Sequence, residues 1–189
     1  MIRIGILGGI GSGKSYIAKN FGYPVFNADL EVGKLYKKNK KTFKKLNKVL
    51  PNYIYSFPVN KSKLSEAILA NKSNLNKIVK IVHLEIRKRM IIFLRKNKNK
   101  KIVILDIPLL LENKINNNKD ILVFVESKKL DILQRLKKRG NFNNELYRKL
   151  QNIQLPLRYK KKKSKFVIKN DFTYKSAKRA IKNILSKII

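Results

Sequence analysis

Eight consecutive residues near the beginning of the chain have the composition of a phosphate-binding loop. They read Gly8-Gly9-Ile10-Gly11-Ser12-Gly13-Lys14-Ser15 and satisfy the pattern G-x-x-x-x-G-K-[ST]. Glycines allow consecutive backbone N–H groups to point inward at phosphate oxygens, and the positive end of a following helix strengthens that attraction. Lys14 is expected to reach the β- and γ-phosphates, and Ser15 to offer its hydroxyl to a bridging Mg²⁺. The motif predicts a nucleoside triphosphate site, against the alternative of a glycine turn that binds no nucleotide.

Three acidic side chains follow predicted strands and are further candidates for chemistry. Asp29 could accept a proton from an acceptor hydroxyl or help to hold the metal, although Asn27 and Asp29 are equally good residues for capping a helix. Asp106 ends an apolar strand, where proteins with this loop commonly keep a metal-associated acid, and is a secondary candidate. Glu112 could cap or bridge elements near the site, and a purely structural role is as good an interpretation.

Four arginines gather in and around a polar, basic segment that is interrupted by Pro156. The planar guanidinium group suits phosphate oxygens better than lysine does, so some of these arginines are expected to close over the triphosphate. For any single one, a solvated position is the simpler interpretation. We favour Arg139, beside Gly140, as the arginine that closes over the triphosphate. The four arginines are Arg135, Arg139, Arg148 and Arg158.

The only histidine, His83, lies near Glu85 and Arg87 on a long predicted helix. Partner ligands at a useful spacing are missing, so packing or capping is favoured over metal binding. The chain contains no cysteine, which excludes disulfides and thiolate metal sites.

The elements that must position these residues alternate between strand and helix, which predicts an α/β fold. Ile2–Leu7 reads as a strand and Lys14–Asn20 as a helix, on either side of the glycines. Continuous apolar runs at 101–107 and 121–126 are typical of strands buried on both faces of a parallel sheet. Further strands are predicted at 24–26 and 166–168, and helices at 74–94, 128–138 and 174–188. The predicted parts are a nucleotide-binding core (about 1–28, 101–138 and 164–189), a helical insertion (about 29–100) and a lid (about 139–163).

The formal net charge of +35 would ordinarily suggest a nucleic-acid partner. The lysines recur along the whole chain among many asparagines instead of clustering, so we interpret the charge mainly as compositional drift. A basic RNA-binding protein remains the alternative from a different class. The apolar runs at 2–7 and 102–111 are too short for an export signal or a membrane span, so a cytoplasmic protein without membrane or specific nucleic-acid partners is expected.

Taken in order, these motifs resemble the dephospho-CoA kinase family over nearly the whole chain. The glycine-rich loop is similar to that family's P-loop, and the sequence NAD at 27–29 to its DAD motif. LDIPLLLEN at 105–113 is similar to its PLL-x-E segment, and QLPL at 154–157 with FVIKN at 166–170 to its Q-x-P-L and F-V-I-D-N stretches. The P-loop alone is generic, whereas the ordered set is specific.

The resemblance implies a three-layer P-loop NTPase core with a five-stranded parallel sheet, a helical substrate-binding insertion and a lid. It further implies transfer of the ATP γ-phosphoryl group to the ribose 3′-hydroxyl of dephospho-CoA. We expect a monomer, with an oligomer as the alternative. Asp29 would be the base and a metal contact with Ser15, Arg139 a catalytic lid arginine with Lys14, and His83, with Arg87 nearby, an acceptor contact. The implied ATP-binding residues are Gly9, Gly11, Ser12, Gly13, Lys14, Ser15, Tyr16 and Asn170.

The chain departs from the family pattern at five positions. Asn27 replaces the first acid of the DAD motif, which leaves Ser15 and Asp29 as the expected protein contacts of Mg²⁺. The nearest alternative is another P-loop kinase, one that acts on a nucleoside or nucleotide. Only the helical insertion distinguishes a dephospho-CoA kinase from such an enzyme. The remaining departures are Tyr16 for threonine, Leu84 for proline, and Lys165 and Lys169 for acids.

Overall fold

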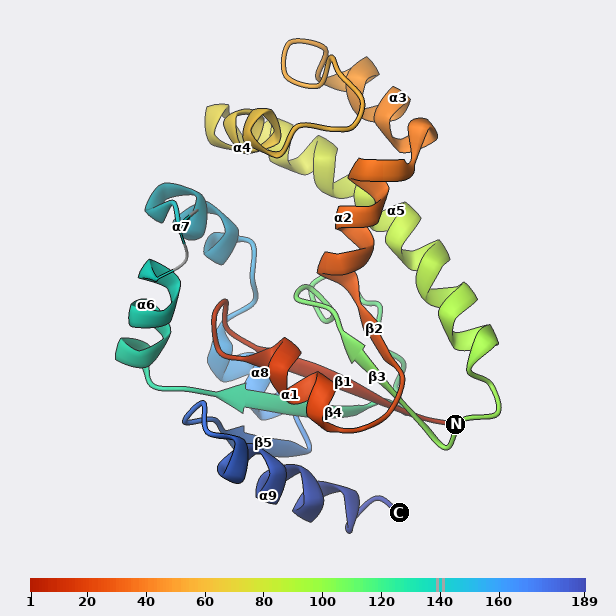
Figure 1. Ribbon diagram of the computed structural model, residues 1–189, viewed down its shortest axis with the longest axis vertical. Coiled ribbons are helices and arrows are strands. Elements are labelled where there is room, and N and C mark those ends of the chain that lie inside the picture. The colour runs from red at the N-terminus through yellow and green to blue at the C-terminus, as the bar shows by residue number, and fades with distance from the viewer. Residues whose placement is uncertain (139, 141) are drawn as a thin grey trace. The chain divides into compact units, whose positions relative to one another are not determined.

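The computed structural model describes residues 1–138, 140 and 142–189, which form two compact units (Figure 1). The first, here called the sheet unit, consists of Met1–Asn27, Asn97–Phe142 and Leu150–Ile189. The second, here called the helical unit, consists of Ala28–Lys96 and Asn143–Lys149. Each unit is described by itself below.

The described residues of the sheet unit form a five-stranded sheet in the order β2-β3-β1-β4-β5, and every neighbouring pair is parallel. Parallel strands place their carboxyl ends at one edge of the sheet, so the loops that follow them converge there. This confirms the predicted α/β class and the parallel sheet of five strands. The strands are β1 (Ile2–Gly8), β2 (Val25–Asn27), β3 (Ile102–Asp106), β4 (Ile121–Glu126) and β5 (Phe166–Lys169).

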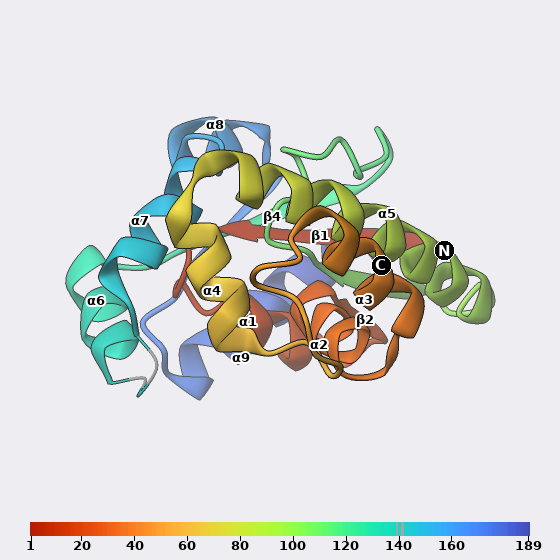
Figure 2. The same ribbon diagram turned by 90° about the horizontal axis from the view of Figure 1, so that it is seen from above.

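Helices cover both faces of this sheet, giving three layers (Figure 2). On one face α1 (Lys14–Asn20) and α9 (Tyr174–Leu185) pack their apolar side chains against Ile4 and Ile6 of β1. On the other face α8 (Leu157–Lys163) packs against β1 and β4. Side chains alternate between faces along a strand, so Gly5 faces the second layer. A Cβ atom at Gly5 would lie 2.6 Å from Leu110 Cδ2, so the turn after β3 packs directly on the β1 backbone.

The segment predicted as a polar, mobile lid is largely helical. It contains α7 (Asn144–Asn152), whose residues are divided between the two units, and α8, which belongs to the sheet unit; α6 (Lys129–Lys137) precedes it. Within this segment α8 packs on the sheet and Lys160 is buried, while the other residues of the helix are exposed. A lid formed by the remainder of 139–163 stays a prediction.

The helical unit contains α2 (Ala28–Lys38), α3 (Lys40–Val49), α4 (Lys61–Ala70) and α5 (Lys72–Lys96). Apolar side chains from each helix, including Leu35, Leu46, Leu64 and Ile78, are buried where α5 packs against the other three. In the described part of the chain, no helix is both long and apolar enough to cross a bilayer.

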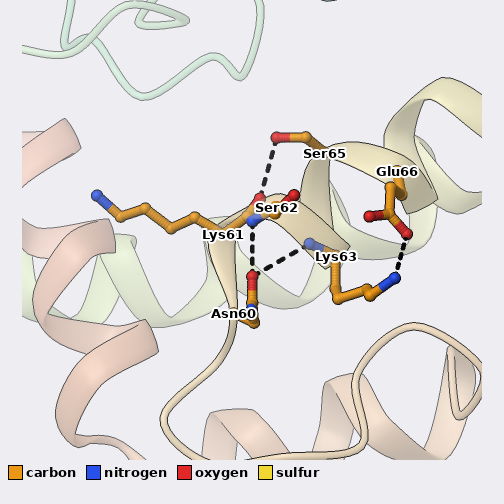
Figure 3. A network of polar contacts seen from close by, with 6 residues as sticks. All are labelled: Asn60, Lys61, Ser62, Lys63, Ser65 and Glu66. Carbon is orange, nitrogen blue, oxygen red and sulfur yellow. Dashed lines mark hydrogen bonds and ion pairs between the residues drawn. The ribbon is translucent and has the colours of Figure 1, made fainter. Parts of the chain in front are cut away.

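The start of α4 shows how short polar contacts define a helix end in this lysine-rich chain (Figure 3). The side-chain oxygen of Asn60 accepts hydrogen bonds from the backbone N–H groups of Ser62 and Lys63, at 2.8 and 3.3 Å. Those two N–H groups would otherwise lack a partner in the first turn. Lys63 in turn donates to Glu66, at 2.8 Å, along the exposed side of the same helix.

Candidate active site

The glycine-rich loop joins β1 to α1 and has the backbone geometry that its sequence predicts. Gly11 and Gly13 have φ angles of 80° and 89°, in the left-handed region that favours glycine. At Gly13 an added Cβ would also collide with the side-chain amide of Asn170. The loop is closed by a hydrogen bond from Ser12 N–H to the Gly9 carbonyl at 3.2 Å. A side chain at Gly13 would therefore both strain the backbone and displace a neighbour.

Lys14 lies at the first position of α1 and is buried against the loop. Its ammonium group donates a hydrogen bond to the Gly9 carbonyl across the loop, at 2.7 Å. The contact holds a positive charge beside the backbone N–H groups that precede α1. An anion bound there would meet both the ammonium group and the positive end of the helix.

Two side chains from other strands fasten the tip of the loop. Ser127, after β4, and Asn170, after β5, each donate a hydrogen bond of 2.9 Å to the carbonyl of Ser12. Asn170 is buried, and its side-chain oxygen accepts from the backbone N–H of Phe172 at 3.1 Å. The sequence pointed to Asn170 only through the family resemblance, and Ser127 was not identified. A serine one residue beyond an apolar strand gives no distinctive signal before the strand order is known.

Oxygen-bearing side chains converge where β2 and β3 end beside α1. The parallel register pairs Asn27 with Asp106, and the Asn27 amide donates to the Asp106 carboxylate at 2.5 Å. The same amide lies 3.5 Å from the hydroxyl of Ser15. Asp106 is almost fully buried, as expected for a residue at the end of a central strand. Ser15 and Asp106 supply hard oxygen donors of the kind that Mg²⁺ prefers.

The described residues contain no group of three or more histidine, cysteine, aspartate or glutamate side chains suited to holding a metal ion. Among the described residues, a metal here would take at most two ligands from carboxylate or imidazole side chains. This is the usual situation for Mg²⁺ in kinases, where phosphate oxygens and water complete the coordination. The side chains around Ser15 therefore fit a metal that arrives with a nucleotide.

The predicted acceptor-side residues all belong to the helical unit. Asp29 is exposed in the first turn of α2, and on α5 His83 is half-buried with Arg87 exposed one turn further along. Helices α2 and α5 are joined by an ion pair between Glu31 and Arg89, at 2.7 Å. The roles of Asp29, His83 and Arg87 in substrate binding remain predictions.

Glu31, which joins α2 to α5 through Arg89, is a titratable group with a shifted pKa. Burial acts to raise the pKa of its carboxyl, but hydrogen bonds and charge from Lys34 and Arg89 outweigh burial. The pKa therefore lies below its ordinary value of 4.5. The ionised carboxylate is the form that holds the two helices together.

Glu112, in the turn after β3, bridges two parts of the chain. Its carboxylate accepts a hydrogen bond from the backbone N–H of Leu155 at 2.9 Å and lies 2.6 Å from the ammonium group of Lys160. This confirms the bridging interpretation of Glu112. Lys160 itself is fully buried, which the sequence did not indicate.

Two hollows of the sheet unit adjoin the loop. One, of about 290 Å³, is lined by Gly9, Ser12, Leu157 and Arg158 among others. The other, of about 430 Å³, lies between the segments that follow β4 and β5, with Ser127 in both linings. The first hollow is lined in part by the phosphate loop, and the second by Ser127 and Asn170, which donate hydrogen bonds to Ser12 of that loop.

The remaining predicted residues lie as follows. Arg135 stacks over the ring of Phe172, 4.2 Å from its centre, while Arg148 is exposed on α7. Tyr16 is exposed on α1. Arg139, the favoured lid arginine, lies outside the described residues, so its role stays a prediction.

Comparisons with known proteins identify the family of the chain. A family model described as dephospho-CoA kinase matches residues 2–176. A dephospho-CoA kinase from Wolbachia sp. subsp. Brugia malayi is 33% identical, over 98% of this chain and 97% of its own length. One from Bacillus thuringiensis subsp. konkukian is 32% identical, over 98% and 96%.

Solved structures show the same fold. TT1252 from Thermus thermophilus superposes with a TM-score of 0.78 at 24% identity, covering 100% of this chain and 98% of its own. Dephospho-CoA kinase from Campylobacter jejuni gives a TM-score of 0.62 at 21% identity, covering 98% and 96%. The family match extends over most of the chain and the sequence relatives exceed 30% identity, so the chain belongs to the dephospho-CoA kinase family of ATP-dependent kinases.

Proposed function

We propose that this chain transfers the γ-phosphoryl group of ATP to the ribose 3′-hydroxyl of dephospho-CoA, the last step of coenzyme A biosynthesis, with Mg²⁺ as the metal. The observation that carries the proposal is Lys14, buried across a glycine loop of the family's sequence and bonded to the Gly9 carbonyl. A buried ammonium group is costly unless it has a strong partner. A triphosphate is a partner of opposite charge for this ammonium group, and the loop places the group beside backbone N–H groups that would contact the same phosphates.

Phosphoryl transfer needs positioning and charge stabilisation more than covalent help from the protein. The N–H groups of the loop and the Lys14 ammonium would hold the β- and γ-phosphates while negative charge shifts toward the leaving oxygen. The bonds from Ser127 and Asn170 to Ser12 keep the loop in place during this step. Little reorganisation of the loop is then needed at the moment of reaction.

Asp29 is proposed as the base. It follows Asn27 by two residues, and Asn27 is bonded to Asp106 at the edge of the sheet where the phosphate loop also lies. An exposed carboxylate at the start of α2 can accept a hydrogen bond from an incoming hydroxyl and take its proton as the new bond to phosphorus forms. The side chain would also orient the hydroxyl for attack in line with the leaving group.

The residues proposed to hold Mg²⁺ are Ser15 and Asp29, and Asp106 is added to them because it lies with Asn27 beside Ser15. When bound, the ion would neutralise charge on the β- and γ-phosphates. Asn27 replaces an acid of the family pattern, so the Asp106 carboxylate becomes the buried acid next to the Ser15 hydroxyl. Its hydrogen bond from Asn27 fixes the orientation of that carboxylate.

Binding of dephospho-CoA is proposed for the helical unit. Arg87 offers a planar guanidinium group to the pyrophosphate, and His83, one turn earlier on α5, offers a ring nitrogen to the same ligand. Arg139 is proposed to close over the phosphates from the lid. The fold itself is common to P-loop kinases with other acceptors, so the acceptor is the part of the proposal that most needs a direct test.

The test is a panel of acceptors assayed for ADP release, with mass spectrometry of the product. Dephospho-CoA should be phosphorylated with ATP and Mg²⁺, and AMP, CMP and shikimate should be poor acceptors. Efficient phosphorylation of any of these three, with none of dephospho-CoA, would overturn the choice of acceptor while leaving the kinase assignment intact. EDTA should abolish turnover, and adding back Mg²⁺ should restore it.

A further inference from the structure

One lysine in this lysine-rich chain is buried completely. Lys160 is 0% exposed, although it begins a tract whose other members, Lys161, Lys162 and Lys163, are exposed. Its ammonium group lies 2.6 Å from a carboxylate oxygen of Glu112. A buried ion pair commonly adds little net stability compared with apolar side chains of similar size, because both charges lose their hydration. Stability alone is therefore a weak reason for placing a charge here.

Glu112 holds α8 from two directions. The carboxylate oxygen that faces Lys160 also accepts the backbone N–H of Leu155, at 2.9 Å. Leu155 directly precedes Pro156, and the Pro156 carbonyl accepts the first hydrogen bond of α8 from Lys160 N–H, at 3.1 Å. The Glu112 carboxylate therefore contacts the chain just before α8, at Leu155, and again within the first turn of α8, at Lys160. This fixes both the place and the direction of that turn.

The first turn of α8, which Glu112 contacts, supports the phosphate loop. Leu157, between Leu155 and Lys160, packs against Gly9. A Cβ atom added at Gly9 would lie 3.5 Å from a Leu157 methyl group. The Gly9 carbonyl is the group that receives the Lys14 ammonium hydrogen bond. The next residue, Arg158, lines the same hollow as Gly9 and Ser12. A continuous line of contacts therefore runs from Glu112 through α8 to the catalytic lysine.

We propose that Glu112 and Lys160 are positioning residues for ATP: they hold Leu157 under Gly9 and so set the position of Lys14. The inference rests on the proposed function, in which this loop binds the triphosphate. Without the ion pair, the first turn of α8 would shift, the Gly9 peptide would lose its support, and Lys14 would be held less well for the phosphates. The acceptor site, for which no residue of this line is proposed, should be unaffected.

The experiment compares Lys160→Met with Lys162→Met. Both changes replace a lysine of the same helix by an unbranched apolar side chain, but position 162 is exposed. The dissociation constant of Mg-ATP is measured by calorimetry, and KM for each substrate by ADP release, at a temperature where both proteins are folded by circular dichroism. Lys160→Met should raise the dissociation constant and the KM of ATP about tenfold, while the KM of dephospho-CoA at saturating ATP stays within twofold. Lys162→Met should match the unaltered protein in every value.

The outcomes separate the inference from the proposed function. If the unaltered protein does not bind Mg-ATP, the proposed function fails. If it binds and folded Lys160→Met binds as tightly, the pair is merely structural and the inference is overturned. Should Lys160→Met fail to fold, Leu157→Ala decides, because Leu157 is 45% exposed and its removal leaves the buried pair in place. Weaker Mg-ATP binding with unchanged dephospho-CoA binding supports the inference, and unchanged Mg-ATP binding overturns it.

Discussion

Truncating Asn170 to alanine should loosen the phosphate loop without changing which base the protein prefers. The buried amide makes two hydrogen bonds, donating to the Ser12 carbonyl at 2.9 Å and accepting from Phe172 N–H at 3.1 Å. At about 1 kcal/mol for each bond, Asn170→Ala should lower the free energy of unfolding by about 2 kcal/mol. For a chain of this size that corresponds to a fall in Tm of about 4–8 °C. Ser127→Ala removes one bond to the same carbonyl and should cost about half as much.

The informative assay is binding of Mg-ATP and Mg-GTP to both variants, at a temperature well below their unfolding. Both variants should bind the two nucleotides more weakly by a common factor, because the loop contacts phosphates that ATP and GTP share. The ratio of the two dissociation constants should stay that of the unaltered protein. A loss confined to ATP in Asn170→Ala, with Ser127→Ala unchanged, would refute this reasoning and show that Asn170 acts by contacting adenine.

Lys14→Ala should lower kcat about a hundredfold or more and abolish thermal stabilisation by Mg-ATP, because the loop loses the ammonium group that faces the phosphates. If Mg-ATP raised the Tm of the variant as much as it raises that of the unaltered protein, the prediction would be contradicted. Asp29→Asn should lower kcat about a hundredfold or more, the range of general-base effects, with the Mg-ATP dissociation constant within twofold; near-normal turnover would remove Asp29 from the mechanism. Because the pKa of Glu31 is lowered in the folded state, its contribution to stability is present above the ordinary value of 4.5 and is lost as the pH falls through the lowered value. In urea titrations at several pH values, the unfolding free energy of Glu31→Gln should therefore fall less at acidic pH than that of the unaltered protein. Glu66→Gln, in an exposed pair, should show the same fall as the unaltered protein. RNA binding driven by the charge of +35 should disappear at high salt without base preference; retention at high salt would favour a nucleic-acid role.

The parts of the fold that could be predicted are the elements that a short stretch of sequence determines by itself. The glycine motif, together with the apolar run before it, predicted the strand and helix around the phosphate loop, and α1 spans Lys14–Asn20 as expected. The strand predicted at 121–126 is likewise β4, because a run of apolar residues buried on both faces has few other solutions. Strand-end acids such as Asp106 were identified for the same reason: parallel strands bring their carboxyl ends to one edge.

The parts that could not be predicted depend on which segments meet in space. Lys160 has the same sequence surroundings as its exposed neighbours, and only the packing of α8 on the sheet brings it to Glu112. Asn27 was interpreted as an altered acid or a helix cap, but the pairing of β2 with β3 aims its amide at Asp106. Ser127 gave no local signal, because its partner is a backbone carbonyl of the loop. Each of these residues acts through a contact that periodicity does not encode.

The central strand β1 has a consequence for how the chain is made. It is synthesised before both of its neighbours, because Ile4 pairs with Ile104 of β3 and with Ile121 of β4, which follow much later. At about 5–20 residues per second, translation of the intervening chain takes roughly 5–25 seconds. During that interval the apolar strand has neither edge paired, whereas most of the helical unit, Ala28–Lys96, is already synthesised and can collapse locally. A nascent chain halted before β3 begins at Ile102 therefore has β1 unpaired on both edges, and its phosphate loop lacks the neighbouring strands.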